Sequence, residues 1–128
     1  MKRTLFFAAL AAFFVGCSRQ QSTLTLALTG MDAEDSVIVY NTGITDGFRN
    51  AEVDTLAMPN GNLSIALTGD SARSYKIYKL PRRYPDGTME AMSMVGINVP
   101  VMPGADIRVE GDFGNHTITG SIPFYKDL

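Results

Sequence analysis

Hydrophobic and polar residues alternate along most of the chain after residue 23, and turn residues interrupt the alternation at fairly even spacing. Leu24, Leu26 and Leu28 are separated by single threonine and alanine residues, which is the period of two of a strand with one buried face. No window of helical length shows a repeat of 3.6 residues. Eight strands are predicted in this way, at 24–28, 37–40, 53–58, 63–67, 75–80, 92–102, 107–110 and 117–119. We therefore predict an all-β domain over residues 24–125, either an antiparallel β-sandwich or a partly open barrel of about eight short strands.

The segments between these strands contain residues that favour turns. Asn60-Gly61 stands between two apolar runs and is the strongest hairpin signal in the chain, so it predicts a hairpin of strands 53–58 and 63–67. Pro81 is expected to end a strand because it lacks the N–H that a ladder needs, and a loop is expected over 82–88.

The predicted strand 92–102 has Gly96 as a bulge and ends before Pro103-Gly104. Met92 and Met94 lie two residues apart, so they share one face of that strand. Alternating apolar residues on a strand normally belong to the core, and methionine fills irregular gaps there. Thioethers also suit soft ions such as Cu(I), so Met89, Met92, Met94 and Met102 are an alternative candidate for a metal site, but the pattern favours the core.

The first sixteen residues have the three parts of a secretory signal peptide. Lys2 and Arg3 supply positive charge, residues 5–15 form an apolar run, and a small residue, Gly16, precedes Cys17. Eleven apolar residues are too few for a transmembrane helix, which needs about 20. Residues 1–16 are therefore predicted to be removed, leaving 17–23 as a short tether before the domain and 126–128 as a C-terminal end or truncated linker.

The sequence Phe14-Val15-Gly16-Cys17 resembles the bacterial lipobox, although Phe14 stands where Leu is most frequent. The resemblance implies that Cys17 receives a thioether-linked diacylglycerol and becomes the first residue of the mature protein. Several acyl chains together give the stable anchoring that a single chain does not. The alternatives are a plain signal peptide with an incidental cysteine, or a buried free thiol.

Charge and cysteine content exclude several classes of protein. Removal of residues 1–16 leaves 9 basic and 13 acidic side chains, and this balance does not favour a nucleic-acid-binding protein. A single cysteine excludes an intramolecular disulfide and a Cys-x-x-Cys redox pair.

A set of short motifs resembles domain of unknown function 4369, and together they cover residues 24–125. The motifs are Val53-Asp54-Thr55, Asn60-Gly61, Leu80-Pro81, Pro103-Gly104-Ala105-Asp106, Gly111-Asp112-Phe113 and Ile118-Thr119-Gly120-Ser121. The resemblance implies an all-β module that follows a lipoprotein signal and commonly precedes a thioredoxin-like domain in thiol-disulfide oxidoreductases of Bacteroidota. Because this chain lacks the cysteine pair, no oxidoreductase activity is assigned to it.

Other candidate sites were compared with simpler explanations. His116 is the single histidine and is expected to lie at a strand edge. Asp32, Glu34 and Asp35 lack the spacing of a calcium loop and are expected in a solvated turn. The basic group Lys79, Arg82, Arg83 and Tyr84 could contact anionic headgroups or a partner domain, or form an exposed charged loop. Three Asp-Ser/Thr-aliphatic triplets resemble an O-glycosylation acceptor of exported proteins, and their acceptor residues are Ser36, Thr55 and Ser71.

Three functional hypotheses follow from these features. The first is a non-catalytic, lipid-anchored accessory module of the cell envelope, associated with a thioredoxin-like domain or protein. The second is a stand-alone periplasmic lipoprotein that binds a small ligand or an envelope protein. The third, an enzyme, is disfavoured because no nucleophile–base pair, paired-carboxylate motif or phosphate-binding loop is present, although carboxylates distant in sequence could meet in space. We expect no cofactor. Ser18 stands after Cys17 in place of the inner-membrane retention Asp, which favours the outer membrane, with the inner membrane as the alternative. The acidic cluster associated with surface export in Bacteroidota is absent just after Cys17, which favours the periplasmic face.

Overall fold

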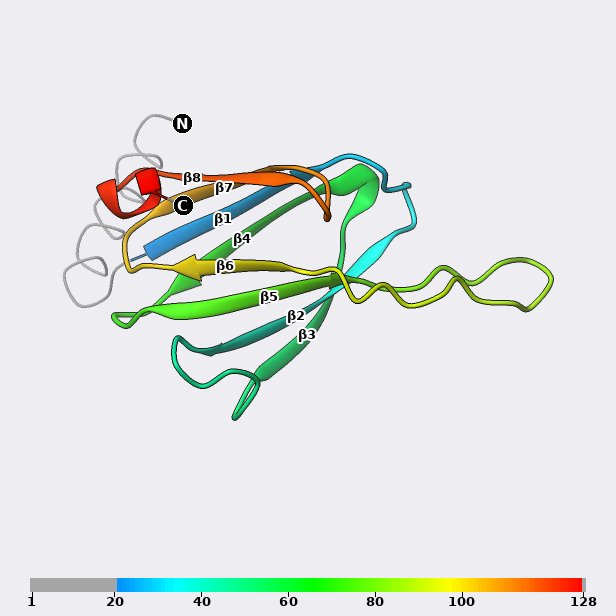
Figure 1. Ribbon diagram of the computed structural model, residues 1–128, viewed down its shortest axis with the longest axis horizontal. Coiled ribbons are helices and arrows are strands. Elements are labelled where there is room, and N and C mark those ends of the chain that lie inside the picture. The colour runs from blue at the N-terminus through cyan, green and yellow to red at the C-terminus, as the bar shows by residue number, and fades with distance from the viewer. Residues whose placement is uncertain (1–20, 128) are drawn as a thin grey trace, which may run out of the picture.

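The computed structural model describes residues 21–127, and over this range the chain forms eight strands in two four-stranded sheets (Figure 1). The expected all-β sandwich is confirmed, and the sheets do not close into a barrel. The predicted signal segment and Cys17 lie outside the described residues. The strands are β1 (Gln21–Leu28), β2 (Ser36–Gly43), β3 (Glu52–Ala57), β4 (Asn62–Thr68), β5 (Arg73–Lys79), β6 (Ile97–Val101), β7 (Asp106–Gly111) and β8 (His116–Gly120). Two short 3-10 helices complete the fold, η1 (Pro59–Gly61) and η2 (Pro123–Asp127).

The two sheets have the strand orders β4-β1-β7-β8 and β3-β2-β5-β6. All neighbouring strands run antiparallel except β1 and β7, which pair in parallel. The first strand starts at Gln21, three residues before the predicted strand, because its alternation continues back through the buried Ser22.

The core lies between the sheets and consists mainly of alternate residues of the central strands β1, β2, β5 and β7 and of the edge strand β6. In the parallel pair, Leu24 is in register with Ile107 and Leu26 with Val109, so both strands direct apolar side chains into the same layer. Burial of each such side chain contributes about 1.5–3 kcal/mol. The edge strands β4 and β8 are only half-buried on their inner face. The buried apolar residues are Leu24, Leu26, Leu28, Met31, Val37, Val39, Met58, Tyr75, Ile77, Ile97, Val99, Val101, Ala105, Ile107, Val109 and Tyr125.

The hairpin predicted around Asn60-Gly61 is wrong, because β3 and β4 belong to different sheets. The chain crosses between the sheets there, with Met58 fully buried below the crossing. The turn does need positive φ, which is 56° at Asn60 and 81° at Gly61. A Cβ on Gly61 would collide with the backbone of Leu28. The local backbone requirement was therefore predicted correctly, and the partner of each strand was not.

The strand predicted over 92–102 is also wrong in its first half. Only Ile97–Val101 pairs in a sheet, as β6, whereas residues 80–96 form a long arm that projects beyond the end of the sandwich (Figure 1). Met92 and Met94 lie on this arm and are 55% and 85% exposed, so their predicted place in the core is incorrect. The sandwich already has a full inner layer without them, and no opposing sheet covers the arm.

Candidate functional site

The arm, residues 80–96, is a hairpin with a tight tip. Tyr84 donates its N–H to the carbonyl of Thr88 at 2.8 Å, and Gly87 donates its N–H to the carbonyl of Tyr84 at 3.0 Å. Asp86 Oδ1 accepts hydrogen bonds from the N–H of Thr88 at 2.9 Å and from its hydroxyl at 2.6 Å. These contacts close a turn at Asp86-Gly87, within the loop predicted over 82–88.

An ion pair fixes the base of the arm to the connection between β1 and β2. Arg82 Nε lies 2.9 Å from Asp35 Oδ1, and Arg82 Nη2 lies 2.8 Å from Asp35 Oδ2. The second oxygen also accepts the N–H of Asp32 at 2.7 Å. The hydrogen bonds from Arg82 lower the pKa of the Asp35 carboxyl below its ordinary value, against the opposing effect of its burial. A carboxylate only 4% exposed is thus held ionised by a forked guanidinium.

A second ion pair joins the two limbs of the arm near its base. Lys79 Nζ lies 2.6 Å from Glu90 Oε1, which also accepts the N–H of Arg82 at 3.3 Å. The Lys79 hydrogen bond lowers the pKa of Glu90. Within residues 21–127, Arg83 is the basic residue of the arm that forms no ion pair, so carboxylates neutralise most of the predicted basic group.

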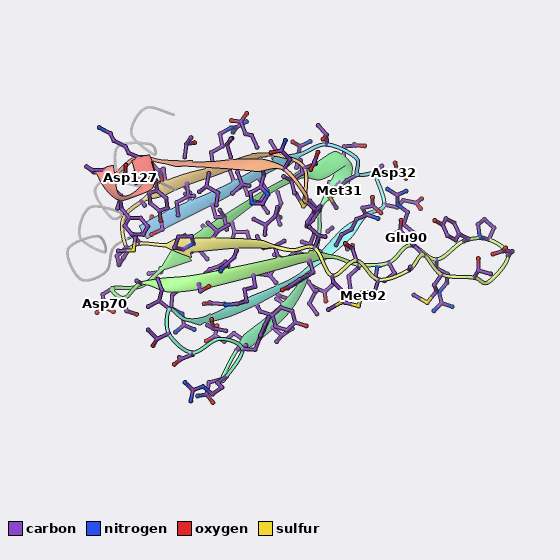
Figure 2. The ribbon with its side chains drawn as sticks, in the orientation of Figure 1. Met31, Asp32, Asp70, Glu90, Met92 and Asp127 are labelled. Atoms are coloured by element: carbon purple, nitrogen blue, oxygen red, sulfur yellow. The ribbon has the colours of Figure 1, made fainter. Side chains whose placement is uncertain are left out.

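The arm exposes an unusual concentration of apolar side chains. Of nine large hydrophobic residues exposed within residues 21–127, five lie on the arm. Figure 2 labels Met92 on the arm beside Glu90, at the end of the sandwich opposite to Asp70 and Asp127. Scattered exposed apolar residues are normal, but contiguous ones mark surfaces that contact another molecule. The five are Tyr84, Met89, Met92, Met94 and Val95.

A groove of about 310 Å³ opens at the other end of the sandwich, between the two sheets. Leu67 and Tyr75 line its apolar part, and Arg73 and Glu52 lie at its rim. It shares Leu67, Tyr75 and Glu52 with a second hollow of about 320 Å³ along the open side between β3 and β4. Burial raises the pKa of Tyr75, so its phenol stays protonated there. Pattern analysis could not predict this groove, because its lining comes from five separate segments of the chain.

The remaining predicted site residues do not assemble into a catalytic centre. His116 is half-buried at the start of the edge strand β8, as expected, with Nδ1 3.2 Å from the carbonyl oxygen of Asp112. Asp35 is engaged by Arg82, whereas Glu34 is exposed. Within residues 21–127, no three His, Cys, Asp or Glu side chains converge on one point, and no helix is long and apolar enough to cross a membrane.

The three predicted glycosylation acceptors differ in accessibility. Thr55, on β3, and Ser71, between β4 and β5, are exposed, whereas Ser36 is half-buried at the start of β2. Ser36 also accepts the N–H of Leu80 through its carbonyl at 3.0 Å. Glycosylation stays a prediction, with Thr55 and Ser71 the sterically open acceptors.

Three comparisons with known proteins found no match. No family model matches the chain, and neither a curated protein nor a solved structure matches it. The site is therefore interpreted from its own geometry.

Proposed function

We propose that the protein is a lipid-anchored, non-catalytic interaction module of the bacterial cell envelope, which presents the arm to a partner protein. The partner class implied by the resemblance to domain of unknown function 4369 is a thioredoxin-like thiol-disulfide oxidoreductase, as a further domain or a separate chain. The proposed anchor is diacylglycerol on Cys17, at the periplasmic face of the outer membrane. No catalytic residue or cofactor is assigned.

The observation that carries this proposal is the placement of the arm. The first strand starts at one end of the sandwich, and the arm leaves from the other (Figure 1). An eight-residue strand spans about 26 Å. A lipid on Cys17 would therefore leave the exposed apolar surface pointing away from the membrane, where a partner in the periplasm can reach it.

The two ion pairs at the base support the same proposal. Without Arg82–Asp35 and Lys79–Glu90, a projecting hairpin of seventeen residues would lose its fixed direction. Rigid presentation lowers the entropy that binding must remove, which favours a recognition role over a passive loop.

Fractionation tests the anchor. The native protein is expected in the membrane fraction with an N-terminal peptide that begins at Cys17 and carries three acyl chains, and Cys17→Ser is expected in the soluble periplasmic fraction. Membrane partitioning that is unchanged by Cys17→Ser would contradict the lipid anchor.

Site-specific photo-crosslinking tests the partner. A benzophenone amino acid at position 84, on the arm, is compared in living cells with the same group at position 117, which is exposed on β8. The proposal expects an adduct from position 84 alone, whose peptides include a Cys-x-x-Cys sequence. Absence of that adduct, or equal adducts from both positions, would contradict partner binding by the arm.

A second candidate function is a binding lipoprotein for a small ligand, and the groove around Leu67 and Tyr75 favours it. Native mass spectrometry of the protein extracted from membranes tests this alternative. A bound small molecule that is lost in Leu67→Trp, which fills the groove, and retained in Thr117→Trp would support it. Retention of the same molecule in both variants would exclude the groove as its site.

A further inference from the structure

The arm exposes three methionine side chains to solvent. Met89, Met92 and Met94 fall within six consecutive residues and are 54%, 55% and 85% exposed. Elsewhere in the described chain, Met31 and Met58 are buried in the core, which is the usual place of methionine. The three exposed residues are called the thioether cluster below.

Apolar packing within the chain does not account for this exposure. No residue of the cluster belongs to the hydrophobic core or packs against it among residues 21–127. Unlike leucine, methionine carries a donor atom, and thioether sulfur selects soft ions such as Cu(I).

The other donor side chains of the arm are already engaged. Glu90 accepts hydrogen bonds from Lys79 and from the backbone, and Asp86 accepts two from Thr88. The arm contains no histidine and no cysteine. Hard or borderline ions, which prefer carboxylate and imidazole, therefore find few ligands here, whereas a soft monovalent ion finds three.

The backbone of the cluster is not held in a sheet. Met89 forms an isolated bridge with Arg83, which places it on the second limb of the hairpin. Beyond Glu90 the limb belongs to no sheet until Ile97, and in this stretch the Val95 N–H donates to Ser93 Oγ at 3.2 Å. Met92 and Met94 lie two residues apart, and each methionine side chain has three rotatable bonds. Binding of one ion by all three sulfur atoms would require this segment to rearrange, and no strand pairing between Glu90 and Ile97 opposes such a rearrangement.

We propose that Met89, Met92 and Met94 form a binding site for one soft monovalent metal ion, Cu(I), with Ag(I) as its non-redox substitute. The ion is held by three neutral sulfur donors at the exposed limb of the arm. Binding involves no electron transfer and does not depend on the partner proposed above.

Competition for Cu(I) tests the site on the full-length chain purified in detergent. All variants carry Cys17→Ser, so that no thiol of unlipidated chain competes for the ion. Cu(I) is supplied as its bicinchoninate complex without oxygen. We expect removal of one equivalent of Cu(I) from the chelator. Each single Met→Leu substitution in the cluster should weaken binding by at least about tenfold, since even outer-shell changes cost that much, and the triple substitution should abolish it.

Met102→Leu is the matched control, because Met102 is half-buried against the core and lies outside the arm. It should bind Cu(I) as the parent chain does. Substitutions at the three exposed positions should not alter unfolding by urea, which separates loss of the site from loss of the fold. Unchanged Cu(I) binding by the triple variant, or equally tight binding of Zn²⁺ by the parent chain, would overturn the proposal.

Methionine methyl NMR gives a second measurement that a purely structural role would not affect. In protein labelled with ¹³C-methyl methionine, addition of Ag(I) should shift three methyl signals, and these should be the signals missing from the triple variant. Shifts confined to other methionines would overturn the assignment.

Discussion

The hydroxyl of Tyr125 joins the C-terminal 3-10 helix η2 to the end of the sandwich from which β1 starts. Tyr125 is 3% exposed, donates its hydroxyl to the carbonyl of Pro100 at 2.7 Å and accepts the N–H of Met102 at 2.9 Å. Tyr125→Phe keeps the ring and removes both hydrogen bonds. A buried backbone group left without a partner costs about 1–3 kcal/mol. Because Met102 is half-buried and water can reach part of this site, we expect the free energy of unfolding to fall by about 1–2 kcal/mol in total.

Urea unfolding measures this loss. A denaturant slope of about 2 kcal/mol per molar converts the loss into a fall in the midpoint of roughly 0.5–1 M at an unchanged slope. Tyr84→Phe is the matched control, since Tyr84 is exposed on the arm and its hydroxyl forms no hydrogen bond with the described residues. It should change stability by less than about 0.5 kcal/mol. If Tyr125→Phe and Tyr84→Phe unfold at the same midpoint as the parent chain, the reasoning about the buried hydroxyl is refuted.

The ion pair at the base of the arm predicts a pH dependence. Folding lowers the pKa of Asp35, so the stabilisation from its ionised form is complete above the ordinary pKa of about 3.9 and is lost as the pH falls through the folded pKa. Urea midpoints should therefore decline below about pH 4, and they should decline less in Asp35→Asn. Gly61→Ala should destabilise the fold by at least about 1–3 kcal/mol, because the new Cβ meets both a positive φ and the backbone of Leu28. Gly87→Ala has a positive φ but open space around it, so it should cost about 1–2 kcal/mol. Equal urea midpoints for the two variants would contradict the role of the backbone collision. In dilute hydrogen peroxide, mass spectrometry should find sulfoxide on the thioether cluster well before the two buried methionines, and simultaneous oxidation would contradict their exposure.

The sequence predicted the fold class well because each strand of a sandwich shows its buried face in its own alternation of apolar and polar residues. Leu24, Leu26 and Leu28 alternate with polar or small residues, and all three are buried where expected. The pairing of strands is less local. Asn60-Gly61 did require positive φ. Whether the chain after Met58 returns to the same sheet or crosses to the other sheet, however, is set by contacts that the turn residues do not encode.

The arm shows a second limit of pattern analysis. The alternation around Met92 and Met94 is the same whether a sheet covers them or solvent does, so the pattern cannot distinguish core from surface. Whether a sheet covers these side chains depends on how many other strands the fold contains, and the sandwich fills its inner layer without residues 80–96. Pro81 and the Asp86-Gly87 turn predicted a loop, and they were the available signal that the second limb returns from a projection.

The proposed lipid anchor and the proposed metal site lie at opposite ends of the sandwich, so they are expected to act independently. Four residue steps join Cys17 to Gln21, so the start of β1 can lie no more than about 14 Å from a lipid on Cys17. The sandwich adds about 26 Å, and the arm extends farther still (Figure 1). The helix η2, at the near end, would then lie toward the membrane surface, while the thioether cluster would stand clear of it. Changes at Cys17 should therefore alter membrane attachment without altering Cu(I) binding by the purified chain, and changes in the cluster should do the reverse. A variant at either end that impaired both properties would show that the two ends are coupled through the core.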